Sequence, residues 1–256
     1  MANRVSEGPK RALVTGAGAR LGKAMAQALG EDGWSVAVHY RGSRTGAEET
    51  AETIRAAGGV AELVQADLAD EEQTATLVRA GHEALGGPLT LLVNSASTFE
   101  DDTAIEHTRQ SWDFHMGPNL RAPVLLAQHF ARALPEEEAG LIVNMIDMRV
   151  LKLNPLFFTY TLSKSALWTA TRTLAQSLAP NIRVNGIGPG PTLENVHQKP
   201  GEFDAEARAT LTQQGSNPGE IVKTLRYLID ADSITGQLIA SDGGQHLMWQ
   251  TPDVML

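Results

Sequence analysis

Short apolar runs alternate with longer amphipathic segments along the whole chain of 256 residues. Seven runs have the length and composition of strands: Ala12–Thr15, Ser35–Tyr40, Val60–Ala66, Leu89–Asn94, Leu141–Ile146, Ile182–Ile187 and Gln237–Ser241. Six segments between them have the length and periodicity of helices: Leu21–Asp32, Ala47–Ala57, Glu71–Ala84, Pro118–Leu134, Thr159–Leu178 and Pro218–Ile229. This alternation predicts an α/β fold, with one domain over residues 1–256 and a doubly wound, mostly parallel, seven-stranded sheet.

Two polar stretches interrupt the alternation. Thr98–Ser111 follows the fourth strand, and Pro189–Gln214, which holds Gly, Pro and many charges, follows the sixth. Ligands bind outside the carboxyl ends of the strands in such sheets, so chemistry is expected just after each strand. The two stretches are therefore either ordinary surface loops or a substrate rim and a lid.

Charge and cysteine content narrow the class of protein. Lys and Arg total 21 against 30 Asp and Glu, which gives a net charge of −9 and argues against a nucleic-acid partner. Cysteine is absent, which excludes disulfides and thiolate chemistry and fits a reducing cytoplasm. No apolar run approaches the ~18 residues of a membrane span, and the polar N-terminus does not resemble a signal peptide. We expect a cytoplasmic protein without a membrane partner.

The first strand leads directly into a glycine-rich turn and then a helix. The turn reads Thr15-Gly16-Ala17-Gly18-Ala19-Arg20-Leu21-Gly22. Small residues at this place let backbone N–H groups approach a pyrophosphate at the helix N-terminus, where the helix dipole favours anions. The turn predicts a dinucleotide site, the alternative being a tight turn without a ligand.

The end of the second strand bears on which dinucleotide is bound. His39-Tyr40 is followed by Arg41-Gly42-Ser43-Arg44, and no acid appears until Glu48. NAD sites usually place an acid here for the ribose 2′-OH, whereas NADP sites use arginine for the 2′-phosphate. The arginines and the serine favour NADP(H), the alternative being a solvated basic loop. Asp67, after the third strand, is either an acceptor for the adenine amino group or an ordinary turn residue.

Tyr160 and Lys164 lie four residues apart on a predicted helix and share one face. A nearby ammonium lowers the pKa of a tyrosine toward working pH, which makes the phenol a proton donor for a reduction. By itself such a pair is usual on a helix surface. Its occurrence together with the glycine-rich turn and with Asn94-Ser95-Ala96-Ser97 after the fourth strand favours catalysis.

This ordered set resembles the short-chain dehydrogenase/reductase superfamily over nearly the whole chain. Asn119 matches the asparagine that holds a proton-relay water, and Pro189-Gly190 match the pair that borders the nicotinamide. Ser241-Asp242-Gly243-Gly244 match the segment after the last strand. The resemblance implies a Rossmann-like oxidoreductase that uses NADP(H) and assembles as a homotetramer.

Two departures from the general family pattern identify a subgroup. Arg20 replaces the middle glycine of the turn, and Asp147 replaces the serine thirteen residues before Tyr160. Both resemble the pteridine reductases and the bacterial dihydromonapterin reductases, also described as alternative dihydrofolate reductases. That group also shares the His-Tyr pair, the run Ser95-Ala96-Ser97-Thr98-Phe99 (with Ser95 in place of an Asn) and Asn144-Met145-Ile146-Asp147. Gly42 departs from it, because Arg is common there.

The resemblance implies a role for each matching residue. Hydride passes from NADPH to C6 of a dihydropterin or dihydrofolate while N5 gains a proton, with Asp147, Tyr160, Lys164 and Asn119 as catalytic residues. Phe99 stacks on the pterin, and Arg20 and Ser97 contact both the pterin and the cofactor phosphates, so the implied substrate site is Arg20, Ser97, Phe99, Asp147 and Tyr160. The implied cofactor site is Gly16, Arg20, Leu21, His39, Tyr40, Arg41, Ser43, Asp67, Leu68, Ser95, Ala96, Ser97, Met145, Tyr160, Lys164, Pro189, Gly190 and Thr192.

Two other functions stay open at this level. One is a general carbonyl or 3-oxoacyl short-chain reductase, and the other is a non-catalytic NADP-binding sensor. The seven histidines show no metal-binding spacing, so we expect no metal site. In the predicted substrate loop, about 190–214, the acids Glu194, Glu202 and Asp204 favour an uncharged pterin substituent over the glutamate tail of dihydrofolate.

The C-terminal segment 244–256 is unusually apolar for a tail. Its apolar side chains are Leu247, Met248, Trp249, Val254, Met255 and Leu256. A free tail would expose this surface to water, so we predict that it packs, across a subunit boundary near a neighbour's site.

Overall fold

Seven parallel strands form the centre of the molecule, in the order β3-β2-β1-β4-β5-β6-β7. The computed structural model describes residues 4–194, 198–251 and 254. The strands are β1 (Arg11–Val14), β2 (Ser35–Tyr40), β3 (Ala61–Gln65), β4 (Leu91–Asn94), β5 (Gly140–Met145), β6 (Ile182–Pro189) and β7 (Leu238–Ser241). The strand order reverses between β1 and β4, so the predicted doubly wound α/β sheet is confirmed.

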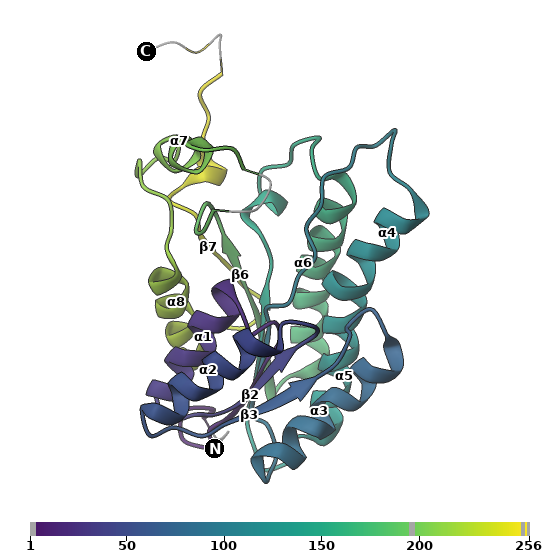
Figure 1. The fold of residues 1–256 in the computed structure, drawn as a ribbon, viewed down its shortest axis with the longest axis vertical. Helices are drawn as coiled ribbons and strands as arrows, with labels where there is room; N and C mark the ends of the chain where they lie inside the picture. The colour runs from purple at the N-terminus through teal and green to yellow at the C-terminus, as the bar shows by residue number, and fades with distance from the viewer. Residues whose placement is uncertain (1–3, 195–197, 252–253, 255–256) are drawn as a thin grey trace.

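Helices cover both faces of the sheet (Figure 1). Alternate residues of β1 enter different cores, with Ala12 and Val14 in one and Leu13 in the other. Helices α1 (Arg20–Glu31), α2 (Arg44–Ala56) and α8 (Pro218–Asp230) complete the first core. Helices α3 (Glu71–Leu85), α5 (Ala122–Ala133) and α6 (Phe158–Leu178) complete the second. No helix in the described ranges is long and apolar enough to cross a bilayer.

The pattern missed two short helices, one that begins at the end of the first polar stretch and one inside the second. Helix α4 (Arg109–Met116) continues through a π-helical turn, Gly117–Arg121, into α5, so the helical run begins well before the predicted start. Its start is a capping box, in which Thr108 and Ser111 each accept the other's backbone N–H. Helix α7 (Glu202–Arg208) lies in the predicted lid. Residue His115 is the only buried residue of α4, and α7 buries none, so neither shows an apolar period.

A buried polar chain fixes α6 to the sheet. The Asn94 amide donates to Asn144 Oδ1 at 2.8 Å, and the Asn144 amide donates to Thr171 Oγ1 at 2.9 Å. These groups come from β4, β5 and α6, and all three side chains are buried. Because unpaired polar groups are costly in a core, these two hydrogen bonds favour one placement of α6 on the sheet.

The C-terminal segment follows β7 through the short 3₁₀-helix η3 (Gln245–Leu247). Within this chain Leu247 and Trp249 are largely exposed, at 58% and 52%. Its contact with the body includes the bond that Lys152 Nζ donates to the Met248 carbonyl. Met255 and Leu256 lie outside the described residues, so the packing across a subunit boundary stays a prediction, as does the homotetramer.

His39 connects three strands near the glycine-rich turn. Its Nδ1 accepts the Gly16 N–H at 3.1 Å, so Nε2 carries the proton and donates to the Ala66 carbonyl at 3.1 Å. The ring is fully buried, and burial lowers the pKa of His39 from 6.5 to about 4. The folded protein therefore contains His39 in its neutral form.

This arrangement predicts a loss of stability in acid. The pKa of His39 is lower in the folded state, so between pH 6.5 and about 4 the unfolded chain binds the proton more readily. The stability that is present above pH 6.5 is lost as the pH falls through this window, by roughly 3 kcal/mol. We expect Tm to fall less steeply from pH 7 to pH 5 in His39→Gln than in the wild type. The control is His107→Gln, an exposed histidine, whose profile should follow the wild type; equal slopes in all three proteins would contradict the prediction.

Candidate active site

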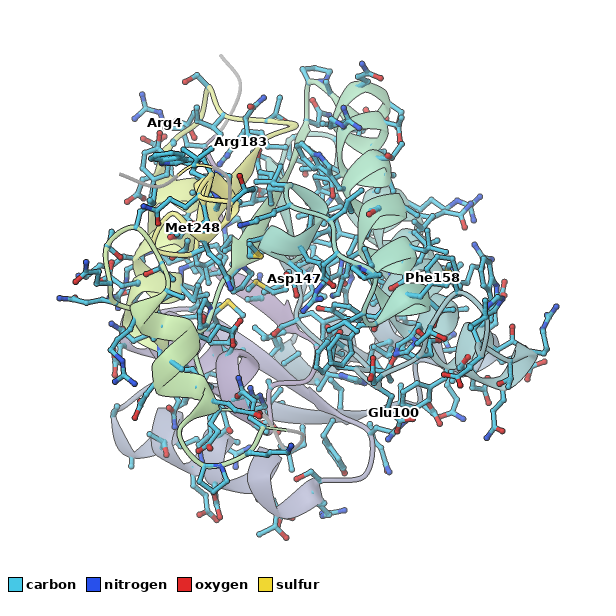
Figure 2. The ribbon with its side chains drawn as sticks, turned by 90° about the horizontal axis from the view of Figure 1, so that it is seen from above. Arg4, Glu100, Asp147, Phe158, Arg183 and Met248 are labelled. Atoms are coloured by element: carbon cyan, nitrogen blue, oxygen red, sulfur yellow. The ribbon has the colours of Figure 1, made fainter. Side chains whose placement is uncertain are left out.

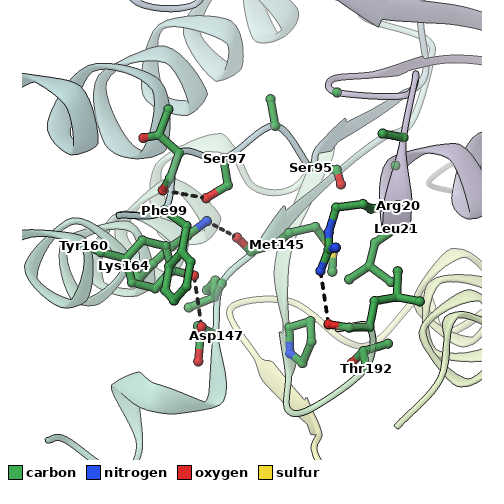
Figure 3. A pocket seen from close by; sticks show the side chains of 18 of the residues that line it. Arg20, Leu21, Ser95, Ser97, Phe99, Met145, Asp147, Tyr160, Lys164 and Thr192 are labelled. Atoms are coloured by element: carbon green, nitrogen blue, oxygen red, sulfur yellow. Dashed lines mark hydrogen bonds between the residues drawn. The ribbon is translucent and has the colours of Figure 1, made fainter. Parts of the chain in front are cut away.

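A cleft of about 1130 Å³ opens at the carboxyl ends of the strands (Figure 3). It contains nearly every residue that the sequence singled out. The predicted residues that line it are Gly16, Arg20, Leu21, His39, Tyr40, Arg41, Ser43, Asp67, Leu68, Ser95, Ala96, Ser97, Phe99, Met145, Asp147, Tyr160, Lys164, Pro189, Gly190 and Thr192. The cleft therefore joins the predicted dinucleotide site to the predicted catalytic pair.

Asn119 is the exception, because it is buried and does not line the cleft. Its Oδ1 accepts from the Thr98 N–H at 2.8 Å and from Ser97 Oγ at 3.1 Å. Its amide nitrogen donates to the Thr98 carbonyl at 2.9 Å and to Ser163 Oγ at 3.3 Å. The side chain thus holds the loop after β4, and the implied relay-water role of Asn119 stays a prediction.

The first turn touches the loop after β4 without room for a side chain. Gly16 has φ +67°, and a Cβ there would lie 2.9 Å from Ala96 Cα. Thr15 Oγ1 accepts from the N–H groups of Ser95 and Ala96 at 2.9 and 3.0 Å. Thr15 was not among the predicted site residues, although it opens the glycine-rich run. It binds the two loops together at the point where the strand order reverses.

Arg20 takes the left-handed conformation, with φ +51°, at the start of α1. Its guanidinium donates to the carbonyls of Glu194 and Leu193 at 2.7 and 3.2 Å. Figure 3 shows it reaching from the turn toward the loop after β6. The arginine therefore bonds to the predicted substrate loop across the mouth of the cleft.

A carboxylate, that of Asp147, lies beside the pair Tyr160 and Lys164. Tyr160 Oη donates to Asp147 Oδ2 at 2.9 Å (Figure 3). Asp147 Oδ1 accepts the Arg149 N–H at 2.7 Å. Lys164 Nζ donates to the Met145 carbonyl at 2.8 Å. Because both of its neighbours are donors, Asp147 fits as the ionised carboxylate.

The expectation that Lys164 lowers the pKa of Tyr160 is wrong in this geometry. Burial raises the pKa of Tyr160 well above its usual value, and the charge and hydrogen bond of Asp147 raise it further. The ammonium of Lys164 lies 5.7 Å from the centre of the tyrosine ring and bonds elsewhere. Burial lowers the pKa of Lys164 to about 8, although Asp147 opposes this shift. Tyr160 therefore keeps its proton and donates it in the hydrogen bond to Asp147.

Two rings form one wall beside this pair. Phe99 stacks on Phe157, with ring centres 4.2 Å apart and planes 15° apart. Phe99 also meets Tyr160 in a T-shaped contact, with ring centres 4.7 Å apart and planes at 81°. Phe157 precedes α6 with φ +55°, and its N–H donates to Asp101 Oδ1. No sequence motif pointed to Phe157.

A buried cluster sets the distance between Phe99 and Tyr160. Asp102 accepts from the N–H and the hydroxyl of Thr159, the residue before the tyrosine. His115 Nε2 accepts the Glu100 N–H at 3.1 Å, so its Nδ1 carries the proton and donates to Thr159 Oγ1 at 2.7 Å. The loop after β4 is thereby bonded to the first turn of α6.

The outer rim of the cleft comes from three segments that carried no motif. They are the short helix η2 (Met148–Val150) with the loop after it, the lid around α7, and η3. Seen from above, Asp147 lies between α6 and the C-terminal segment around Met248 (Figure 2). The rim residues that sequence reasoning missed are Met148, Arg149, Lys152, Leu153, Asn154, Gln198, Phe203, Glu206 and Gln245.

Comparison with known proteins agrees with this geometry. The model of a family described as enoyl-(acyl carrier protein) reductase matches residues 16–246. The chain belongs to the short-chain dehydrogenase/reductase family. Among curated relatives of this family, the 3-oxoacyl-[acyl-carrier-protein] reductase FabG of Staphylococcus aureus is 30% identical, with 93% of this chain and 98% of FabG covered.

Two solved structures of the family are more similar. FolM alternative dihydrofolate reductase 1 of Brucella canis, complexed with NADP, is 47% identical with a TM-score of 0.92, over 99% of this chain and 98% of that one. The same enzyme of Brucella suis, also with NADP, is 48% identical with a TM-score of 0.93, over 98% and 100%. The resemblance to the pteridine reductase and alternative dihydrofolate reductase group is confirmed.

Burial of Tyr160 beside Asp147 predicts an unusual tyrosine titration. The chain has three tyrosines, so labelling at Cζ gives three carbon resonances, of which exposed Tyr227 is an internal reference. We expect Tyr160 to stay protonated to higher pH than Tyr227, and Asp147→Asn to lower the pKa of Tyr160, because the charge of the carboxylate is removed. Titration of Tyr160 at or below the pH of Tyr227 in the wild type would contradict the assigned bond.

Proposed function

We propose that this protein is an NADPH-dependent reductase that acts on a dihydropterin or dihydrofolate, reducing the C6=N5 bond to the tetrahydro form. The proposal is supported by the hydrogen bond between Tyr160 and Asp147 in the cleft and by the T-shaped contact of Phe99 with that tyrosine. The Brucella enzymes of similar structure carry the name dihydrofolate reductase.

The residues present fit NADP(H). The backbone of the first turn approaches Ala96 too closely for any side chain at Gly16. The N–H groups of Gly16 and Ala17 donate to His39, so a pyrophosphate would meet the first N–H groups of α1, which no side chain caps. Arg44 pairs with Glu48 at 2.7 Å and does not line the cleft, so Arg41 and Ser43 would hold the 2′-phosphate. The Ser43 hydroxyl makes no cap bond to α2 and can donate to that phosphate. Bound NADPH supplies the hydride.

Asp147 and Tyr160 favour a nitrogen heterocycle over a ketone. A ketone oxygen needs two hydrogen-bond donors, but here a carboxylate stands beside the tyrosine and accepts its proton. A carboxylate at that position repels a carbonyl oxygen and attracts the N–H and amino groups of a pterin. The proton held between Tyr160 and Asp147 can then pass to a ring nitrogen as the neighbouring carbon is reduced.

A general carbonyl or 3-oxoacyl reductase is the second candidate. The similarity to FabG favours it, because Tyr160 and Lys164 match the general family pattern. Asp147 and Arg20 argue against it, since both depart from that pattern. A non-catalytic NADP-binding sensor would need the cofactor pocket without the proton donor, and here the donor is in place.

The first experiment measures NADPH oxidation with dihydrofolate, dihydromonapterin and dihydrobiopterin, with a 3-oxoacyl thioester as control. We expect turnover of at least one pterin, and a loss of about a hundredfold or more in Asp147→Ser, the size of a general-acid contribution. NADPH affinity should be retained in this variant. Turnover of the thioester alone would favour the second candidate, and NADPH binding without any turnover would favour a sensor.

The lowered pKa of Lys164 predicts how NADPH binding depends on pH. Its pKa of about 8 means that the ammonium is present below pH 8 and is lost above it, so NADPH affinity should weaken as the pH rises through 8. In Asp147→Asn this midpoint should move lower, because the carboxylate raises the pKa of Lys164. The dissociation constant can be followed by nucleotide fluorescence without turnover. The control is Asp113→Asn, an exposed acid paired with Arg109; an identical midpoint in all proteins would contradict the assignment.

A further inference from the structure

The cleft is lined by more positive than negative side chains, although the chain as a whole is acidic. The chain is acidic, with a net charge of −9. The cleft, however, is lined by five Lys or Arg residues (Arg20, Arg41, Arg149, Lys152 and Lys164) and three Asp or Glu residues (Asp67, Asp147 and Glu206). Arg20 and Arg41 lie at the dinucleotide turns, and Lys164 lies beside Tyr160. Arg149 and Lys152 remain without a role in the proposed reaction, on the rim just beyond Asp147.

Arg149 is held in place with hydrogen-bond donors to spare. Its Nη1 donates to Asn154 Oδ1 at 2.9 Å, and its guanidinium carbon lies 5.0 Å from the centre of the Phe157 ring. Its Nε is buried and has no hydrogen-bond partner among the described residues. A guanidinium carries five N–H donors, and an unpaired buried donor is costly. The side chain is thus fixed before any ligand binds.

Lys152 adds a second cation on the same segment. Its Nζ donates to the Met248 carbonyl at 3.1 Å, which leaves two of its three N–H donors. Lys152 is exposed, so it contributes less to binding than the half-buried Arg149.

The acids of the lid do not oppose these cations. Glu194, Glu202 and Asp204, which favoured an uncharged substituent in the sequence, do not line the cleft. The acid of the lid that does line it is Glu206, and its carboxylate accepts from the amides of Gln198 and Gln245 at 3.0 Å each. The interpretation from the sequence is therefore revised, because those three acids do not line the cleft.

We propose that Arg149, assisted by Lys152, is a specificity-determining residue that binds a carboxylate on the C6 substituent of the substrate. The inference rests on the proposed function. Reduction at C6 and N5 beside Tyr160 and Asp147 places the start of this substituent next to the rim that carries Arg149. A planar guanidinium binds a carboxylate through two parallel hydrogen bonds, and aromatic support from Phe157 fixes its plane. The site is thus selective for acidic over neutral pterins.

The test compares dihydrofolate, which carries carboxylates, with dihydrobiopterin, whose side chain is uncharged. In Arg149→Met we expect KM for dihydrofolate to rise about tenfold, equivalent to about 1.4 kcal/mol, with kcat within about twofold. The KM for dihydrobiopterin should change less than threefold. Arg149→Lys should recover part of the loss, and Lys152→Met should show a smaller effect in the same direction. The control is Arg79→Met, which removes one exposed charge outside the cleft.

Binding without turnover gives an independent readout. In the presence of NADP⁺, the dissociation constant of folate should rise about tenfold in Arg149→Met, and that of biopterin should not. An equal loss of kcat on both substrates would overturn the proposal, because Arg149 would then act through Asp147 and Tyr160. Unchanged constants for both ligands would overturn it as well. Failure of the proposed function is recognised separately, since the wild type would then bind NADPH and reduce neither pterin.

Discussion

The hydrogen bond between Tyr160 and Asp147 governs the chemistry of this cleft. Burial and the carboxylate of Asp147 raise the pKa of Tyr160 and keep the proton on the phenol, and the same carboxylate opposes the loss of the ammonium on buried Lys164. The opposite charges of Asp147 and Lys164 therefore partly offset the cost of burial beside a neutral phenol. The pair fixes both where a proton is held and which substrate atoms are attracted to it.

The fold supplies the rigidity that this bond requires. The buried chain from Asn94 through Asn144 to Thr171 positions α6 on the sheet, and Asp102 binds the first turn of the same helix. Each of these bonds joins segments far apart in the sequence and excludes alternative placements, because breaking one would leave a buried polar group unpaired. The phenol and the wall of aromatic rings are thus pre-organised before a ligand arrives.

Relatives of this chain are named for different substrates, a 3-oxoacyl-[acyl-carrier-protein] for FabG and dihydrofolate for FolM. In this chain the glycine-rich turn, Tyr160 and Lys164 match the general pattern of the family. Asp147 departs from that pattern beside Tyr160, and Phe99 and Arg149 also line the cleft. The proposed substrate class therefore rests on a few side chains and not on the type of sheet that carries them.

The sequence by itself determined the sheet, the helices around it and the cofactor half of the site, because these depend on local periodicity and on residues that directly follow strands. It missed α4 and α7, whose residues are too polar to show a period. Tertiary structure alone decided that the pKa of Tyr160 rises. The rise comes from burial of the ring and from its bond to Asp147, which lies thirteen residues earlier in the chain. Tertiary structure also brought Arg149, Phe157 and the lid together at one rim. The sequence could not predict this, because no local pattern records which side chains meet across a cleft.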